Sequence, residues 1–275
     1  MKFTKMQGCG NDYVYVDCFS ETVDNPSELA RSIADRHYGV GGDGLILIEP
    51  SDRADARMRM FNQDGSEGGM CGNGIRCVAK YVYDHGLIPP SRRAVRIDTR
   101  SGVKEITLCV DSGKVTQATV DMGEAKLTGP VPEKITIRGM GLSFIGVDVG
   151  NPHAVYFLED NPALGVSHVE ELPLETMGRD FETHFRFPDR VNSEFIEVLS
   201  PGEIRFRVWE RGSGETLACG TGATAAAFAG ISAGKLSENV LVHLAGGDLA
   251  IRYDAESGHC FMTGPAVEVF SGVLE

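Results

Sequence analysis

The stretch that decides the fold is Arg57–Gly74, RMRMFNQDGSEGGMCGNG, because the chain repeats it as Arg205–Gly222, RFRVWERGSGETLACGTG. The two stretches align without a gap at an offset of 148 residues. An aromatic residue, Phe61 or Trp209, is matched between them. Six further positions are identical: Arg57/Arg205, Arg59/Arg207, Glu67/Glu215, Cys71/Cys219, Gly72/Gly220 and Gly74/Gly222.

Three further segment pairs extend this repeat in the same order. NDYVYV from Asn11 aligns with NPHAVY from Asn151, and GLILI from Gly44 aligns with NSEFI from Asn192. VDMGEA from Val120 resembles FMTGPA from Phe261. Chance similarity in a glycine-rich chain explains four ordered matches poorly, so the sequence predicts an internal duplication. We expect an N-terminal lobe of residues 1–120 plus 264–275 and a C-terminal lobe of residues 121–263.

Alternating and apolar runs predict the same strands in each half. They are Tyr13–Asp17, Leu45–Glu49, Val95–Thr99, Ile106–Val110, Ala154–Leu158, Phe195–Leu199, Ile204–Trp209 and Val240–Leu244. The alternating tail Ala266–Leu274 is expected to return to the first half as a strand.

An apolar helix is predicted directly after each Cys-Gly-x-Gly, over Gly72–His85 and Gly220–Ala233, with a glycine just beyond its end. Shorter helices are expected at Ser27–Tyr38 and Leu174–Thr183. The predicted fold class is therefore α/β (α+β), with two pseudo-symmetric lobes, each a curled mixed sheet around a central helix.

Charge and composition exclude several classes of protein. The net charge of −13 repels phosphate backbones, which argues against a nucleic-acid partner. The longest uncharged run, Thr216–Gly234, has four glycines and few large apolar side chains, so it predicts a buried helix and no membrane partner. The opening MKFTKMQG lacks an apolar leader, and seven scattered cysteines are typical of a reduced, cytoplasmic protein.

A cysteine at the mouth of a helix has unusual chemistry. The unpaired N–H groups and the helix dipole favour its thiolate, and the neighbouring glycines let a carboxylate approach the backbone. One such element suggests a thiol nucleophile. Two elements related by duplication suggest Cys71 and Cys219 facing one cleft from opposite sides.

That arrangement suits inversion at a carbon centre, where one thiolate removes a proton and the opposing thiol returns one to the other face. With each sulfur at roughly 3–3.5 Å from the carbon, the two sulfurs would lie about 6–7 Å apart. No phosphate-binding or dinucleotide motif, HExxH motif or zinc-type cysteine spacing is present, so we expect neither a cofactor nor a metal. A pyridoxal lysine is not excluded by motif.

Several strings together resemble the diaminopimelate epimerase family over nearly the whole chain, from Gln7 to about Gly264. They are GCGNDYV, FNQDGSEGGMCGNGIR, GNPHAV, RVNSEFIEV and WERGSGETLACGTGA. The resemblance implies a cofactor-independent enzyme that interconverts LL- and meso-2,6-diaminopimelate on the route to lysine and peptidoglycan. It also implies an active site in the cleft between two similar lobes.

The resemblance assigns a role to each matching residue. Cys71 and Cys219 would be the acid/base thiols, with His153 and Glu210 tuning their pKa values. Backbone donors to the reacting carboxylate would come from Gly72, Asn73, Gly220 and Thr221. The distal amino-carboxylate end would be held by Asn11, Asn62, Asn151, Asn192, Arg211 and the Glu210 backbone.

Two positions near these motifs carry further expectations. Gly44 stands where some family members have glutamine, so a side-chain contact must be lost, replaced by backbone or moved to Asp43. Phe270 matches an aromatic position that the family uses in dimer formation, which implies a homodimer through the tail.

Two alternatives remain at this point. A proline or hydroxyproline racemase would use similar two-thiol chemistry but would not need Arg211 and the asparagine set to read a second amino-carboxylate. A redox-sensing thiol protein without enzymatic activity would instead join Cys71 to Cys219 in a disulfide.

Overall fold

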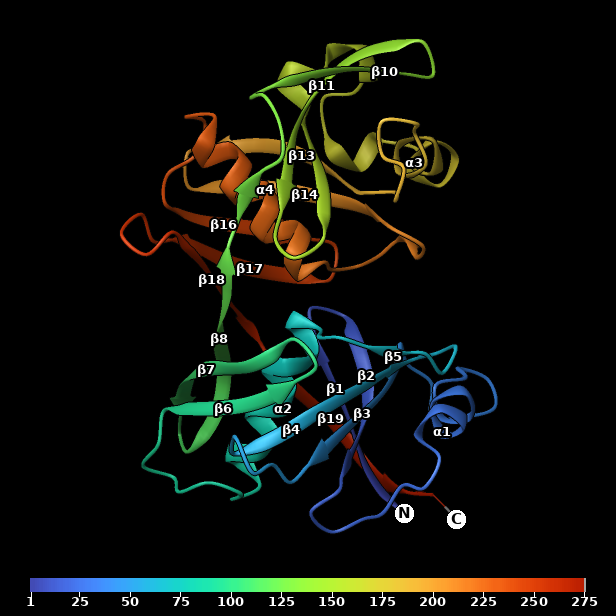
Figure 1. The fold of residues 1–275 in the computed structure, drawn as a ribbon, viewed down its shortest axis with the longest axis vertical. Coiled ribbons are helices and arrows are strands. Elements are labelled where there is room, and N and C mark those ends of the chain that lie inside the picture. The colour runs from blue at the N-terminus through green and yellow to red at the C-terminus, as the bar shows by residue number, and fades with distance from the viewer. Residues whose placement is uncertain (275) are drawn as a thin grey trace. The chain divides into compact units, whose positions relative to one another are not determined.

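The computed structural model describes residues 1–274 and divides the chain into two compact units (Figure 1). Unit 1 comprises Met1–Asp121 and Thr263–Glu275, and unit 2 comprises Met122–Met262. The chain passes from unit 1 to unit 2 within strand β8 and returns within strand β18.

Unit 1 contains two helices, α1 (Pro26–Ile33) and α2 (Gly72–Asp84). Its strands are β1 (Lys2–Gly8), β2 (Asn11–Asp17), β3 (Gly44–Glu49), β4 (Ala56–Asn62), β5 (Glu67–Gly68), β6 (Ala94–Thr99), β7 (Gly102–Asp111), β8 (Lys114–Glu124) and β19 (Val267–Val273). Strand β19 pairs antiparallel with β1, which confirms the predicted return of the tail to the first half.

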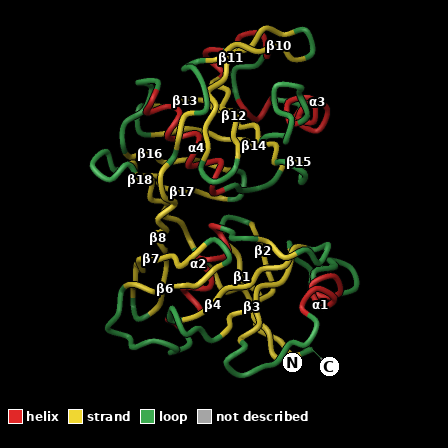
Figure 2. The backbone as a smooth tube through the Cα atoms, in the orientation of Figure 1, coloured by secondary structure: helices red, strands yellow, loops and turns green. Residues whose placement is uncertain are grey.

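Unit 2 contains α3 (Leu174–Glu182), α4 (Gly220–Ser232) and three short 3₁₀ segments, η1 (Leu158–Asp160), η2 (Pro162–Leu164) and η3 (Val169–Glu171). Its strands are β9 (Lys126–Leu127), β10 (Glu133–Ile137), β11 (Met140–Asp148), β12 (Pro152–Phe157), β13 (Asn192–Ser200), β14 (Glu203–Glu210), β15 (Gly214–Glu215), β16 (Asn239–Leu244), β17 (Gly247–Tyr253) and β18 (His259–Pro265). In the tube view, loops separate these short strands (Figure 2).

The strand pairing reproduces the sequence repeat residue by residue. Parallel β2 and β3 pair Tyr13 with Gly44, and parallel β12 and β13 pair His153 with Asn192. These are the positions that the offsets of 140 and 148 equate. Antiparallel β3–β4 corresponds in the same way to β13–β14, and parallel β4–β6 to β14–β16. Each unit is therefore a mixed sheet of the same topology, as the predicted fold class requires.

A central helix lies against the strands of each sheet. Helix α2 contacts β1, β2, β4, β6 and β7, and α4 contacts β11, β12, β13, β16 and β17. Ile75, Val78, Ala79 and Val82 of α2 are fully buried. Gly86 and Gly234 follow the two helices with φ of +73° and +69°, a left-handed conformation that costs glycine little.

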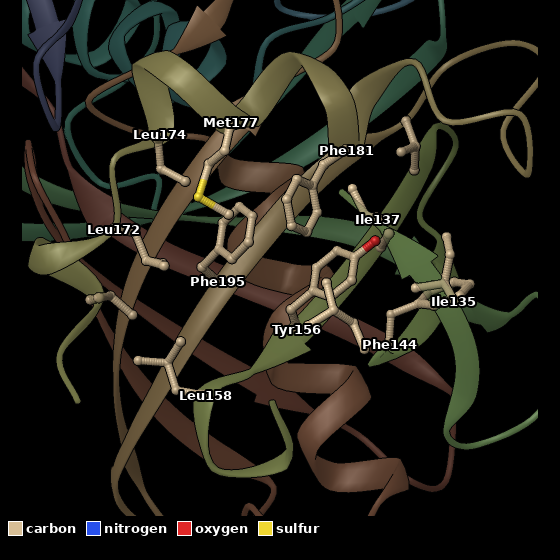
Figure 3. Packing of buried hydrophobic residues seen from close by; sticks show 14 residues of the cluster. Ile135, Ile137, Phe144, Tyr156, Leu158, Leu172, Leu174, Met177, Phe181 and Phe195 are labelled. Atoms are coloured by element: carbon tan, nitrogen blue, oxygen red, sulfur yellow. The ribbon is translucent and has the colours of Figure 1, made fainter. Parts of the chain in front are cut away.

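The opposite face of the unit 2 sheet is covered by α3. Figure 3 shows Phe181 and Met177 of α3 pointing at Tyr156 of β12 and Phe195 of β13. The rings of Phe181 and Tyr156 meet edge to face with centroids 5.1 Å apart, and those of Tyr156 and Phe195 stack at 5.5 Å. This aromatic core fixes β12 and β13, which carry site residues on their other face.

One helix prediction differs clearly from the structure. Helix α1 ends at Ile33, whereas the sequence predicted helix to Tyr38. The Asp35 carboxylate accepts hydrogen bonds from the N–H groups of His37 (2.7 Å) and Tyr38 (2.8 Å), and such local side-chain bonds favour a turn over further helix.

The Thr216–Gly234 run forms the buried helix α4, as predicted. Within residues 1–274, none of the helices combines the length and apolar character that crossing a bilayer requires.

Candidate active site

In unit 1, Cys71 is the N-cap of helix α2. The Gly74 N–H donates to Cys71 Sγ at 3.3 Å, and the thiol in turn donates to Asn11 Oδ1 at 3.1 Å. Gly72 and Asn73 follow in the first turn, where N–H groups have no acceptor inside the helix. The fold therefore brings Asn11, from the start of β2, to the thiol and to two donors suited to a carboxylate.

A network of charges anchors Asn11. Asn11 Nδ2 donates to Asp43 Oδ2 at 2.6 Å, and the Asp12 N–H donates to the same oxygen at 3.1 Å. Arg36 bridges Asp12 and Asp43, and Lys5 pairs with Asp12 at 2.6 Å. Because both ends of the Asn11 amide are engaged, this side chain is held in place before any substrate arrives.

Gly44 has a steric explanation in the structure. A Cβ on Gly44 would lie 2.0 Å from the carbonyl oxygen of Phe61 on the neighbouring strand β4. A glutamine therefore does not fit this backbone. Of the possible replacements for the lost amide, Asp43 is the neighbour that contacts the site, through Asn11.

In unit 2, Cys219 is the N-cap of helix α4 and repeats the geometry of Cys71. The Gly222 N–H donates to Cys219 Sγ at 3.3 Å. The Thr221 hydroxyl lies 3.4 Å from the sulfur, and Asn151 Nδ2 donates to that hydroxyl at 3.4 Å. Gly220 and Thr221 supply the first-turn N–H groups that correspond to those of Gly72 and Asn73.

The environment of Cys219 opposes the thiolate that a helix mouth was expected to favour. Burial, together with the negative charges of Glu210 and Glu194, raises the pKa of the Cys219 thiol well above its usual value. The Thr221 hydroxyl and the Gly222 N–H act in the opposite direction but are outweighed. The cysteine is only 6% exposed, so desolvation is the largest of these effects. The surroundings of Cys219 therefore favour the thiol over the thiolate.

A buried His–Glu pair lies behind this helix mouth. His153 Nδ1 is 2.6 Å from Glu194 Oε1, both side chains are fully buried, and His153 Nε2 is 2.9 Å from Asn151 Oδ1. His153 and Asn151 were predicted as site residues from the sequence, whereas Glu194 was not. Its signal was available, because a carboxylate in the apolar run NSEFI is unusual in a buried strand and requires a partner.

The turn after β14 carries Glu210 and Arg211. The Arg211 N–H donates to Asn192 Oδ1 at 2.9 Å, and Asn192 Nδ2 donates to the Pro152 carbonyl at 2.9 Å. Glu210 accepts a hydrogen bond from the Thr216 hydroxyl. Asn192 is thus buried and engaged in holding the turn, while the Arg211 side chain is exposed.

Glu182, at the end of α3, supports the same turn. Its carboxylate accepts hydrogen bonds from Trp209 Nε1 (2.9 Å), the Gly212 N–H (2.9 Å) and Arg190 (3.3 Å). Although burial opposes ionisation, these donors hold the pKa of Glu182 below its usual value. The sequence analysis did not identify this contact.

Two predicted site residues have local partners of their own. Asn62, at the end of β4, donates to the Ser66 hydroxyl at 2.9 Å. The Asn73 side chain accepts from Arg76 at 3.0 Å inside α2, so only its backbone is oriented toward the helix mouth. Of the predicted residues, the structure groups Cys71, Asn11, Gly72 and Asn73 in unit 1. In unit 2 it groups Cys219, Gly220, Thr221, Asn151 and His153, with the Asn192–Arg211 turn bonded to the adjoining strand β12.

The repeat also preserves an ion pair beside each helix mouth. Arg59 contacts Glu67 at 2.9 Å in unit 1, and Arg207 contacts Glu215 at 2.7 Å in unit 2. The first pair joins β4 to β5, and the second joins β14 to β15. Because β5 and β15 lie just before the two cysteines, each pair holds the segment that leads into its helix.

Comparisons with known proteins agree with this duplicated site. The family profile described as Diaminopimelate epimerase matches residues 3–128 and 145–269. The diaminopimelate epimerase of Agathobacter rectalis is 50% identical over 293 residues, covering 100% of this chain and 99% of that protein. That of Acetivibrio thermocellus is 48% identical over 286 residues, with 100% and 99% covered.

Solved structures share the fold at low sequence identity. A hydroxyproline epimerase from Agrobacterium vitis superposes with a TM-score of 0.73 at 16% identity, covering 99% of this chain and 91% of that one. A PhzF family protein from Bacillus anthracis gives 0.70 at 17% identity, covering 100% and 99%. The full-length relatives near 50% identity, the matched profile and the two cysteine-capped helices lead to one conclusion: the chain belongs to the diaminopimelate epimerase family, whose members are isomerases.

Proposed function

We propose that this chain interconverts LL- and meso-2,6-diaminopimelate without a cofactor, in the synthesis of lysine and peptidoglycan precursors. The observation that carries the proposal is the duplicated helix mouth, in which Cys71 and Cys219 occupy equivalent N-caps. The diaminopimelate epimerases that are 50% and 48% identical to this chain over its whole length support the choice of substrate.

The proposed reaction uses the two thiols on opposite faces of one carbon. One sulfur, as thiolate, takes the proton from the carbon next to the carboxylate and becomes a thiol. The electron pair passes into the carboxylate, where the N–H groups of both helix mouths stabilise the added charge. The other thiol then donates its proton to the opposite face and becomes the thiolate, so the reverse reaction runs by the same steps.

The distal amino-carboxylate is assigned to the residues around the Glu210–Arg211 turn. Arg211 is exposed, and its guanidinium suits a carboxylate held by two parallel hydrogen bonds. Asn192 contributes by holding the Arg211 backbone. Asn62 and the Glu210 carbonyl complete the proposed set for the ammonium group, while Asn11 and Asn151 adjoin the thiol ends.

We also propose a homodimer through strand β19. Val269, Phe270 and Val273 expose 54%, 48% and 68% of their surface there, an unusual density of apolar side chains for one strand. Phe270 packs edge to face on Phe3 with centroids 6.1 Å apart, so its ring is held in place for a partner. A reduced, cytoplasmic setting belongs to the same proposal, because the chemistry requires both sulfurs as thiol or thiolate.

The test is exchange of the Cα proton in D₂O with LL-diaminopimelate, using L-proline as the control substrate. We expect exchange with the first compound alone. Cys71→Ala and Cys219→Ala should each abolish epimerisation while the protein remains folded, and Cys109→Ala, a matched change at an exposed cysteine, should leave it intact. Turnover retained in either active-site variant would refute the two-thiol scheme, and exchange with L-proline would favour the racemase alternative.

A further inference from the structure

The duplication places different residues behind the two thiols. The offsets of 140 and 148 equate His153 with Tyr13 and Glu194 with Ile46. The buried carboxyl–imidazole pair behind Cys219 therefore has an aromatic and an aliphatic residue as its counterpart behind Cys71. The helix mouths differ at one more acidic position, because Glu210 stands where unit 1 has Asn62, so the environment of Cys219 differs from that of Cys71 through both carboxylates.

The glycine three residues after each cysteine shows how closely these neighbours approach. A Cβ on Gly222 would lie 2.9 Å from Glu194 Oε1 and 3.2 Å from Cys219 Sγ. A Cβ on Gly74 would lie 2.8 Å from Ile46 Cδ1 and 3.4 Å from Cys71 Cβ. The carboxylate oxygen and the sulfur thus border the same small space, which in unit 1 is bordered by a methyl group.

Hydrogen bonds connect the pair to the Cys219 helix mouth. The Asn151 amide, oriented by its donation to Thr221, presents Oδ1 to His153 Nε2 at 2.9 Å. His153 Nδ1 lies 2.6 Å from Glu194 Oε1, and both side chains are fully buried. Because buried polar groups need partners, each side chain holds the other in place.

Charged and titratable groups face this region from each neighbouring strand. Glu194 is adjoined by His153 of β12, Glu210 of β14, Cys219 at the start of α4 and Tyr156, whose pKa is raised by burial and by Glu194 and Glu133. Burial also raises the pKa of Glu194, which His153 partly offsets. Glu194 Oε2 has no hydrogen-bond partner among residues 1–274, so its negative charge is not fully neutralised by contacts.

We propose that Glu194 is a positioning residue that, with His153, makes the two helix-mouth thiols unequal and keeps Cys219 protonated in the substrate-free protein. Two links carry its influence. The first is the chain of hydrogen bonds from Glu194 through His153, Asn151 and Thr221 to Cys219 Sγ. The second is the negative charge of Glu194 beside the sulfur. The consequence for catalysis, that Cys219 begins as the proton donor, rests on the proposed function.

The experiment measures the reactivity of the two thiols toward an alkylating reagent and needs no substrate. The rate of alkylation by iodoacetamide is followed from pH 6 to pH 10 by peptide mass spectrometry, which resolves Cys219 from Cys71. Below its pKa, a thiol gains tenfold in thiolate fraction for each unit by which the pKa falls. For Glu194→Gln we expect Cys219 to react about threefold to tenfold faster at pH 8, with Cys71 unchanged.

Two matched variants sharpen the test. Glu197→Gln makes the same change three residues along β13, where Glu197 pairs with the exposed His168 at 3.0 Å, and should leave Cys219 unchanged. Glu194→Ile installs the residue that unit 1 uses at the equivalent position, and should accelerate Cys219 as Glu194→Gln does.

Three results would overturn the proposal. The first is an unchanged Cys219 profile in Glu194→Gln and Glu194→Ile. The second is an equal acceleration at the buried Cys77 and Cys260, which would reveal general loosening. The third is loss of the fold in both variants, which would assign Glu194 to stability alone. Failure of diaminopimelate exchange in the wild type, by contrast, would refute the proposed function and leave the alkylation result standing.

Discussion

Gly222→Ala tests how tightly the Cys219 helix mouth is built. The added methyl group would lie 2.9 Å from Glu194 Oε1, 3.1 Å from Phe206 Cζ and 3.2 Å from Cys219 Sγ. Ordinary contacts to such atoms begin near 3.4 Å, so several neighbours must move by a few tenths of an ångström. Glu194 is held by His153 and Cys219 Sγ by the Gly222 N–H, so we expect the methyl group to displace the sulfur from its position at the helix mouth.

Gly222→Ala is expected to affect activity more than stability. Overpacking destabilises by about 1–3 kcal/mol, and alanine recovers about 1 kcal/mol over glycine inside a helix, which leaves roughly 0–2 kcal/mol of net destabilisation. A displacement of 1 Å costs about a hundredfold in rate, so a shift near half that size should lower kcat/KM for diaminopimelate about tenfold. Gly222→Ala is therefore expected to remain folded and to turn over slowly.

The assay pairs thermal unfolding with epimerisation kinetics, and Gly74→Ala is the matched control. Its methyl group would meet Ile46 Cδ1 at 2.8 Å and Met58 Cε at 3.2 Å, which are the ends of flexible side chains. That variant should lose less than about threefold in kcat/KM, because its thiol has room to stay in place. Wild-type kcat/KM in folded Gly222→Ala would refute the view that the helix mouth fixes the sulfur.

Two further changes test the supports of unit 2. Glu182→Gln should weaken the turn held through Trp209 and Gly212 by about 1–3 kcal/mol at pH 7, seen in urea unfolding. Folding lowers the pKa of Glu182, so its carboxylate stabilises the protein above the ordinary carboxyl pKa, and this stabilisation is lost as the pH falls through the folded pKa. The difference in unfolding free energy between Glu182→Gln and wild type should therefore shrink in acid. A difference that does not depend on pH would contradict this. Phe181→Ala should cost about 3–5 kcal/mol by emptying the aromatic core against Tyr156, and a loss below about 1 kcal/mol would show that the core refills the space.

The repeat in the sequence was sufficient to predict much of the fold. The strand register follows the alignment offsets, so that Tyr13–Gly44 and His153–Asn192 pair at equivalent positions, although which strands pair was not predicted. The helix mouths followed from Cys-Gly-x-Gly, since an N-cap and its glycines are local features. These are properties that neighbouring residues determine largely by themselves.

The parts that sequence reasoning missed depend on contacts between distant residues. In the sequence, Glu194 is one polar residue in an apolar strand. Only its contact with His153, 41 residues away, identifies it as part of the site. The opposition to the Cys219 thiolate was missed for the same reason, because local helix geometry favours the thiolate while burial and two distant carboxylates raise the pKa of the thiol. The Glu182 support of the Trp209 turn is equally non-local.

The return of β19 to β1 has a consequence for how the chain folds during synthesis. Met1 and Leu274 are joined by a hydrogen bond of 2.8 Å, and Lys2 pairs with Val273, so the two ends of the chain meet in unit 1 (Figure 1). Unit 2 is a single continuous segment inserted between them. On the ribosome, the inserted unit can therefore complete its contacts before the unit that begins first, whose opening strand waits for the last residues to emerge.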